Sequence, residues 1–224
     1  MKKINIVTYR NSIFGLILLN KIKELKIKVD SIVVIDKTIT DHFMEFKRQI
    51  NKIGLGNTIL HSISIIYENL RTSRILKNKI TYLDYDTFSK NIVFVSSPNS
   101  ASSLSFLARH RPEITVLAHC GLVNVDFLKL SGQTINSHPG ILPYYRGLDV
   151  IEWAIFENEI SRLGSTLHEV DENIDSGTII YTSRYKIKKN DTLSTIKNNI
   201  RNLCILLIIK YLLDNKARFL NNTK

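Results

Sequence analysis

A polar pair, Asn136 and His138, closes a stretch of the chain that otherwise has the pattern of a β-strand. The two residues are separated by one position and follow the apolar Ile135, so their side chains project from the same side of an extended chain. Pro139 and Gly140 come next and interrupt the strand. An amide and an imidazole that project together from a strand end can stabilise a developing oxyanion and exchange a proton near neutral pH.

A second stretch, residues 164–180, adds a carboxylate. Two expected strands flank a loop that is rich in acidic residues, Asp175 among them, and Ser176-Gly177 ends the loop. Such a loop can hold a carboxylate above the edge of a sheet, where it would orient the imidazole and favour its cationic form. Taken alone, the Asn-x-His pair is compatible with a hydrogen-bonded turn, and the acidic loop with ordinary solvation.

The elements that must position these residues alternate between strand and helix. Apolar runs predict strands at 4–9, 31–36, 92–96, 114–118 and 134–136. Helical spacing predicts helices at 12–25, 40–53, 101–109 and 126–130. This alternation indicates an α/β fold with a Rossmann-like, mostly parallel sheet and helices on both faces. The carboxyl edge of such a sheet is where ligands bind, and there we expect Asn136 and His138. Residues 55–91 show no clear pattern.

The C-terminal part of the chain breaks this alternation. Three elements are predicted there: a helix at 148–156, a β-hairpin of strands 165–170 and 178–186, and one long amphipathic helix at 192–213. No internal repeat or long Gly/Ser linker divides the chain. We expect a catalytic domain over residues 1–190, on which a C-terminal helix and basic tail, 191–224, pack. The apolar stripe Leu203-Leu206-Leu207-Tyr211 is expected to face this domain, with a homodimer interface as the alternative.

Composition narrows the class of protein further. The net charge is +11, but no basic run is interleaved with aromatic residues, so solvated lysines are favoured over nucleic-acid binding. Cys120 and Cys204 are too few for a disulfide framework, and no thiol or carboxylate stands at metal-ligand spacing to a histidine. There is no signal-peptide pattern, and the apolar run 203–209 is too short to span a bilayer. We expect a cytoplasmic protein without a metal, a nucleic-acid partner or a membrane anchor.

In their order and separation, the two polar stretches resemble the formyltransferase family, whose members use 10-formyltetrahydrofolate. The family pattern N-x-H-P-x-x-L-P-x-Y-R-G is matched from Asn136 to Gly147, and the pattern G-x-T-x-H-x-V-D-x-x-x-D-x-G-x-I-I from Gly164 to Ile180. A looser resemblance extends over most of the chain. Two long motifs in the correct order are a specific signal. The resemblance implies the formyltransferase fold and the transfer of a formyl group to an amine.

The resemblance also assigns site residues. It maps the family's catalytic residues onto Asn136, His138 and Asp175, and it suggests Tyr145 and Arg146 as contacts of the acceptor substrate. The folate pocket of the family is an apolar cleft closed by backbone groups that read the edge of the pterin ring. Here it is expected to be formed by Gly121, Leu122, Val123, Leu142, Val170, Asp171 and Glu172.

Three further residues need individual treatment. His168 matches a histidine of the family pattern, but a strand-borne histidine is more often structural, so we leave it out of the catalytic set. His119 is expected to line the folate pocket. The turn at 9–15 lacks G-x-G-x-x-G, which leaves a dinucleotide cofactor unsupported. Arg10 in this turn is expected to help the first helix hold an anionic group of the substrate, with an ordinary structural turn as the alternative.

The identity of the amine acceptor is narrowed by what the sequence lacks. Members that act on methionyl-tRNA carry a β-rich tRNA-binding domain, whereas one helix and a basic tail are expected after Ile187. Members that act on glycinamide ribonucleotide use a Gly-rich phosphate loop, where this chain has Tyr9-Arg10-Asn11-Ser12. We therefore favour a small-molecule amine, a nucleotide-linked amino sugar, as expected for a sugar N-formyltransferase.

Two alternatives to this reading stay open. The first is a phosphoribosylglycinamide formyltransferase of purine biosynthesis, which has a similar length. The second is a non-catalytic relic that binds a folate or a nucleotide. The presence of Asn136, His138 and Asp175 together disfavours the relic, because such a protein has no physical need for three polar groups at a strand end.

Overall fold

The structure, a computed structural model, describes residues 2–36, 51, 56, 59 and 85–221 of the 224-residue chain. In the last helix, side chains are described up to Asp214. The helix expected at 40–53 and most of the segment 55–91 lie outside the described residues.

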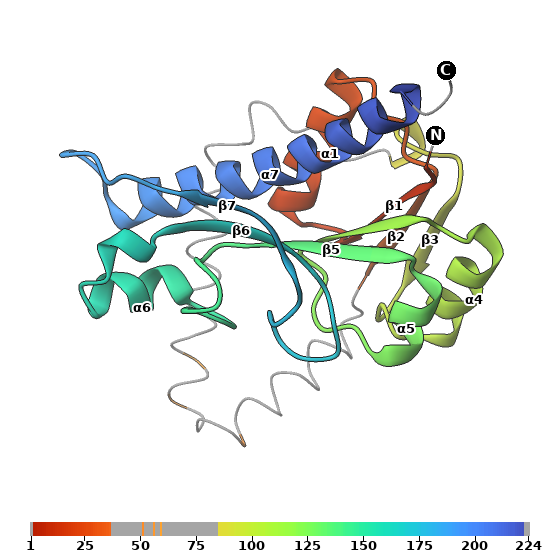
Figure 1. The fold of residues 1–224 in the computed structure, drawn as a ribbon. Helices are drawn as coiled ribbons and strands as arrows, with labels where there is room; N and C mark the ends of the chain where they lie inside the picture. The colour runs from red at the N-terminus through yellow and green to blue at the C-terminus, as the bar shows by residue number, and fades with distance from the viewer. Residues whose placement is uncertain (1, 37–50, 52–55, 57–58, 60–84, 222–224) are drawn as a thin grey trace.

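Seven strands of the described part form one sheet, in the order β3-β2-β1-β4-β5-β6-β7 (Figure 1). They are β1 (Ile4–Tyr9), β2 (Ser31–Ile35), β3 (Ile92–Val95), β4 (Ile114–Ala118), β5 (Gln133–His138), β6 (Gly164–Glu169) and β7 (Ile179–Arg184). Neighbours from β3 to β5 are parallel, whereas β6 runs antiparallel to β5 and β7 to β6. The mostly parallel sheet and the C-terminal hairpin are confirmed. Because the strand order reverses between β1 and β4, their carboxyl ends open the crevice in which such sheets bind ligands.

Helices cover both faces of the sheet, as expected (Figure 1). On one face lie α1 (Ile13–Glu24) and α7 (Leu193–Asn221), and on the other α4 (Ala101–His110) and α5 (Val125–Leu130). Shorter elements are η1 (Tyr85–Thr87), α6 (Val150–Phe156) and η2 (Ile160–Arg162). Successive side chains of each strand point alternately to the two helix layers. Ile6 of β1 belongs to the core beneath α1 and α7, while its neighbour Val7 belongs to the core beneath α4 and α5.

The C-terminal helix α7 runs to Asn221, beyond the expected end at 213, because neither glycine nor proline follows to stop it. It packs against β6 and α1 through a buried row at helical spacing: Ile200, Cys204, Ile208 and Leu212. The expected stripe is only partly correct. Leu207 and Tyr211 are buried, but Leu206 is 54% exposed and faces away from the sheet. No helix of the described residues is long and apolar enough to cross a membrane.

β5 extends farther than expected, to His138, because β6 pairs with it up to its last residue. Asn136 lies opposite His168, and His138 lies opposite Thr166. The polar end of β5 lacks the apolar pattern of a strand, and it is extended because its backbone hydrogen-bonds to β6. Gly164, which begins β6, allows the close approach to β7, since a Cβ there would lie 2.2 Å from a backbone carbonyl oxygen of β7.

Replacing Ile208 with alanine is expected to lower the free energy of unfolding by about 2–5 kcal/mol, the usual cost of a cavity in a core. The side chain is fully buried between α7 and the sheet. Leu206→Ala on the exposed side of the same helix is the matched control and should cost only about 0.5 kcal/mol. Denaturant unfolding curves measure both values. Equal losses would mean that α7 does not dock through this face.

Candidate active site

His138 ends β5 with both ring nitrogens in polar contact. Nδ1 lies 3.2 Å from Oδ2 of Asp175, and Nε2 lies 2.9 Å from the backbone carbonyl oxygen of Tyr145. The side chain is only 3% exposed. The ring is therefore held between two acceptors that come from two different loops.

Asp175 belongs to the loop between β6 and β7, and its carboxylate has three partners. Besides His138, Oδ2 accepts a hydrogen bond from the N–H of Gly147 at 3.0 Å, and Oδ1 lies 3.4 Å from Nε2 of His168. The backbone of Asp175 is left-handed, with φ at 48°, which aspartate tolerates better than most residues. Gly177 in the same loop leaves no space for a Cβ, which would lie 1.9 Å from a carbonyl oxygen of β6. Two backbone positions thus fix where the carboxylate stands.

His168 connects Asn136 to this cluster. Its Nε2 lies 3.4 Å from Nδ2 of Asn136 and 3.4 Å from Oδ1 of Asp175, while Nδ1 lies 2.7 Å from the carbonyl oxygen of Glu169. The expected catalytic set excludes His168, yet this residue contacts two of the three residues in that set. The role of His168 could have been predicted from the register of β5 and β6, which places Asn136 opposite His168. A register of this kind is not readable from a local pattern.

Burial has the largest effect on the charge of this cluster. It lowers the pKa of His138 below the ordinary 6.5, although Asp175 and the hydrogen bond to Tyr145 both raise it. For Asp175, burial acts to raise the pKa, but the contacts with His168, His138 and the N–H of Gly147 together bring it below its usual value. At neutral pH the cluster therefore holds an ionised carboxylate beside a neutral imidazole. Asp175 does favour the cation, as expected, but less than burial disfavours it.

The arrangement prepares His138 to accept a proton. Both ring nitrogens face acceptor oxygens, so a neutral ring, with its single N–H, leaves one nitrogen without a hydrogen bond. Uptake of a proton supplies that hydrogen bond and creates an ion pair with Asp175. What opposes it is the cost of charging a buried group. The cluster can therefore take up a proton transiently when a neighbouring group releases one.

The residues expected at the folate pocket come from two loops beside one core. Val123, after β4, and Val170, after β6, both pack against the core beneath α4 and α5. Leu122 is 70% exposed, and its carbonyl oxygen accepts a hydrogen bond from the side-chain amide of Asn99 at 3.0 Å. An exposed leucine next to a half-buried valine in one loop, with a second half-buried valine against the same core, are side chains of the kind that an apolar wall for a flat ring requires.

The other expected pocket residues differ in their surroundings. Leu142 is buried, and Glu172 is exposed. Asp171 accepts a hydrogen bond from the hydroxyl of Ser176 at 2.6 Å and so shapes the loop that carries the catalytic carboxylate candidate. Gly121 has a φ of 80°, a left-handed conformation that favours glycine. Within the described residues, Asp171 and Gly121 contribute to the expected pocket mainly by fixing the shape of their loops.

The three residues expected to contact the acceptor lie in different surroundings. Arg10 follows β1 at the carboxyl edge, and its Nη1 lies 2.5 Å from Oδ2 of Asp36. Arg146 is exposed in the loop after β5. The ring of Tyr145 is 9% exposed, and its hydroxyl donates to Glu157 at 2.5 Å. Tyr145 therefore faces His138 through its backbone, while the two arginines remain accessible.

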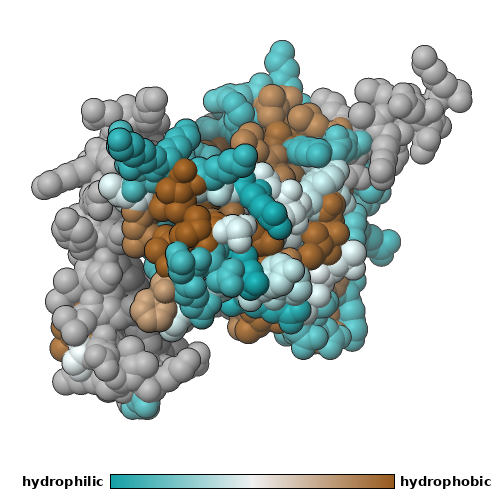
Figure 2. Space-filling view, turned by 60° about the vertical axis from the view of Figure 1, so that its left-hand side comes forward, coloured by the Kyte–Doolittle hydropathy of each residue, from teal (hydrophilic) through white to brown (hydrophobic). Residues whose placement is uncertain are grey.

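The side of the molecule that carries α6 bears exposed apolar residues. Figure 2, which brings the left-hand side of Figure 1 forward, shows hydrophobic side chains between hydrophilic ones. Leu148, just before α6, is 87% exposed, and Phe156 at its end is 82% exposed. Phe156 meets Trp153 edge to face at 5.9 Å. Apolar side chains scattered among polar ones in this way are common on protein surfaces.

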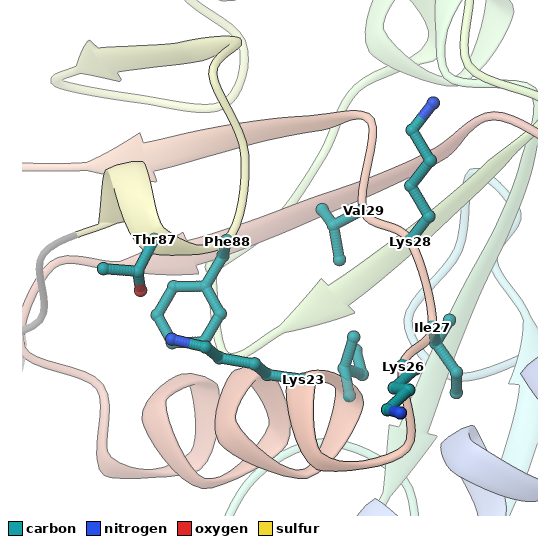
Figure 3. A pocket seen from close by; sticks show the side chains of 8 residues that line it. Lys23, Lys26, Ile27, Lys28, Val29, Thr87 and Phe88 are labelled. Atoms are coloured by element: carbon teal, nitrogen blue, oxygen red, sulfur yellow. The ribbon is translucent and has the colours of Figure 1, made fainter.

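A cavity of about 270 Å³ lies at the opposite edge of the sheet, between the end of α1 and η1 (Figure 3). Its lining comprises Ile22, Lys23, Lys26, Ile27, Lys28, Val29, Thr87 and Phe88. Because β2 begins just after it, the cavity is at the amino ends of the strands, away from His138. The ammonium groups of the three lysines lie far apart in Figure 3, so they do not converge on one anion. This cavity is separate from the candidate site.

The fold and the site together define a Rossmann-like α/β protein with a buried His–Asp pair at the carboxyl edge of its sheet. Residues 1–211 match the model of the family described as formyl transferase. The chain belongs to this family.

Two relatives show the range of formyltransferases that the chain is similar to. It is 35% identical over 106 residues to GDP-perosamine N-formyltransferase of Brucella melitensis, a match covering 46% of this chain and 40% of that protein. It is 36% identical over 99 residues to phosphoribosylglycinamide formyltransferase of Bacillus subtilis, covering 43% of this chain and 50% of that protein. Both matches span less than two thirds of the relative.

A solved structure confirms the formyltransferase fold. Phosphoribosylglycinamide formyltransferase of Streptococcus pneumoniae TIGR4 aligns with a TM-score of 0.60 at 19% identity. The alignment covers 98% of this chain and 99% of that one. At this level of identity the likeness concerns the fold alone.

Replacing Asp175 with asparagine is expected to lower the pKa of His138 further. Asparagine accepts the left-handed backbone of this position but removes the negative charge that raises the pKa of the ring. His138 should then take up its proton at a more acidic pH than in the unmodified protein. NMR titration of the histidine Cε1–H resonances measures the shift, with His110 on α4 as an internal reference. A pKa of His138 that stays the same or rises would contradict the pairing.

Proposed function

We propose that this protein transfers a formyl group from 10-formyltetrahydrofolate to a primary amine. The observation that carries the proposal is the contact of His138 with Asp175, beside Asn136, at the carboxyl end of β5. Membership of the formyl transferase family supports the reaction class. A buried proton acceptor, its anionic partner and an amide donor are the groups that this reaction needs at one place.

Asn136 is the candidate donor to the formyl oxygen. Attack of an amine on the formyl carbon places negative charge on that oxygen, and an amide held at a strand end can stabilise it without reorganisation. Nδ2 of Asn136 lies 3.4 Å from Nε2 of His168. A side-chain amide has two N–H groups. Because Nε2 of His168 donates to Asp175, it does not accept from Asn136, and the amide N–H groups stay available to the substrate.

His138 and Asp175 are the candidate carriers of the proton. The attacking amine must lose a proton, and the folate nitrogen that departs from the formyl carbon must gain one. We infer that the His138–Asp175 pair takes up the first proton, relayed from the amine because both ring nitrogens face protein oxygens, and that Asp175, at 3.2 Å, stabilises the resulting imidazolium. The imidazolium then returns the proton to the departing nitrogen, so the site ends in its starting state.

The folate is proposed to bind against Leu122, Val123 and Val170. Exposed and half-buried apolar side chains from two loops can bury a flat ring, and nearby backbone groups can read its edge. Asp171 holds the same loop that carries Asp175. Binding of the folate and placement of the catalytic carboxylate would therefore depend on one loop conformation.

For the acceptor, we propose a nucleotide-linked amino sugar. Arg10 supplies a positive charge at the carboxyl edge, where side-chain recognition would replace the Gly-rich phosphate loop. A relative named for a GDP-linked substrate supports this choice. Glycinamide ribonucleotide is the second candidate, favoured by the Bacillus subtilis relative.

Asn136→Ala, His138→Ala and Asp175→Asn are each expected to lower kcat by about 10²–10⁴-fold, the usual range for losing an oxyanion donor or a general base. The rate of formyl transfer is measured from the release of tetrahydrofolate. His110→Ala at the end of α4 removes a histidine near the amino end of β5, opposite to the end that carries His138, and should leave kcat unchanged. Circular dichroism verifies that each variant is folded. Variants that keep turnover within threefold of the unmodified protein would refute the catalytic assignment.

A panel of amines offered with 10-formyltetrahydrofolate tests the acceptor. We expect turnover with GDP- or UDP-linked 3-amino or 4-amino sugars and none with free amino sugars, because Arg10 needs a phosphate to bind. Mass spectrometry detects a gain of one formyl group. Turnover of glycinamide ribonucleotide alone would replace the sugar-nucleotide proposal by its alternative. Turnover of no amine, together with failure to bind a reduced folate in calorimetry, would favour the relic.

A further inference from the structure

Three side chains from three neighbouring strands meet at the carboxyl edge, on the far side of the crevice from β5. Arg10 follows β1, Asp36 follows β2, and Phe94 lies near the end of β3. Nη1 of Arg10 is 2.5 Å from Oδ2 of Asp36, and the guanidinium carbon is 5.7 Å from the centroid of the Phe94 ring. The guanidinium thus lies over one face of the Phe94 ring while its Nη1 contacts Asp36.

The ring of Phe94 is exposed yet held in place. It is 52% exposed, and Tyr85 of η1 meets it edge to face, with the ring centroids 6.1 Å apart. The hydroxyl of Tyr85 donates to the backbone carbonyl of Arg10 at 2.8 Å, which ties η1 to the end of β1. A fixed aromatic face beside a guanidinium is a stacking platform for a planar heterocycle. The exposed aromatics of α6, by contrast, contact each other and have no charged partner of this kind among the described residues.

Asp36 stands where a nucleoside sugar would reach it. It follows the second strand of a Rossmann-like sheet, 26 residues after Arg10, a place where an acidic side chain binds ribose hydroxyls in nucleotide-binding sheets. One oxygen, Oδ2, contacts Arg10, and the side chain is 37% exposed. Within the described residues, Oδ1 makes no hydrogen bond. A carboxylate in this state can accept hydrogen bonds from the two neighbouring hydroxyls of a ribose.

Strand spacing sets how far an elongated ligand must reach from His138 to these groups. With strands about 4.8 Å apart, the end of β1 lies about 10 Å from β5 and the end of β3 about 19 Å from it, and the Arg10 side chain extends from β1 toward Asp36 and Phe94. A ligand with its amine at His138 would therefore have to reach across β4 and β1 to meet Arg10, Asp36 and Phe94, which lie together. Glycinamide ribonucleotide ends at its phosphate and would leave the last two groups unused. A nucleotide-linked sugar has a chemical group for each.

We propose that Arg10, Asp36 and Phe94 form a nucleoside-diphosphate subsite that selects a ribonucleotide acceptor over a 2′-deoxyribonucleotide one. This inference rests on the proposed function. Arg10 would bind the diphosphate through guanidinium N–H groups other than the one on Asp36. The Asp36 carboxylate would accept both ribose hydroxyls, and the base would stack on Phe94.

Calorimetry with GDP and 2′-deoxy-GDP, without a sugar or a folate, tests the subsite directly. We expect GDP to bind about tenfold tighter, as the loss of one hydrogen bond to a charged group predicts. Asp36→Asn should reduce this preference to within twofold. Phe94→Leu should weaken both ligands about tenfold and keep the preference, whereas Phe94→Trp should retain affinity because it keeps the aromatic face.

Two matched variants serve as controls for these measurements. Glu24→Gln breaks an exposed ion pair with Lys21 at the opposite edge of the sheet, and Phe156→Leu replaces an exposed aromatic on α6. Both should bind GDP like the unmodified protein. The subsite is wrong if GDP does not bind, if the two nucleotides bind equally, or if Phe94→Leu leaves affinity within twofold.

Formyl-transfer kinetics separate this inference from the function on which it rests. With a GDP- or UDP-linked amino sugar, Asp36→Asn and Phe94→Leu should raise KM for the acceptor about tenfold, with kcat and KM for the folate unchanged. Turnover with an unaltered acceptor KM would overturn the subsite and leave the proposed function standing. Absence of turnover with every nucleotide-linked amino sugar would overturn the proposed acceptor, whatever GDP binding shows.

Discussion

The carboxylate of Asp175 is the point at which separate parts of the chain are held together. It contacts His138 at the end of β5, His168 on β6 and the backbone N–H of Gly147 in the loop between them. Each contact uses a different segment, so the site exists only when β5, β6 and both loops are folded together. The charge of Asp175 is retained under burial because these donors replace water. The position of the His138 ring and the association of the two loops with β5 and β6 both depend on this one anion.

Much of the fold could be predicted from local pattern, and the exceptions have physical causes. The strands β1, β2 and β4 are mostly apolar and almost wholly buried, since parallel strands of this kind contact helices on both faces. The end of β5 is polar and is held as a strand by β6, a partner distant in the sequence. In α7, Leu206 fits an apolar stripe but points outward, because the helix docks on a row displaced from the expected one.

In the candidate site, too, some features could be predicted from local pattern and others could not. Asn136, His138 and Asp175 could be found because each lies in a distinctive local motif. The role of His168 as a bridge depends on strand register, and the neutral state of His138 depends on depth of burial, neither of which is local. Arg10 was recognisable as a cation near a helix start, but its neighbours Asp36 and Phe94 come from two other strands. Contacts across a sheet are what sequence pattern conveys least.

The strand order also bears on how acceptor specificity can change between relatives. The antiparallel strands β6 and β7 occupy one side of β5, so a long acceptor has to extend toward β1, β2 and β3. The groups at those strand ends share no side chain with the His138–Asp175 pair. Substitutions there can accumulate without altering the reacting centre. In a sheet arranged in this way, substitutions at the ends of the far strands can adapt the same reaction to acceptors of different length.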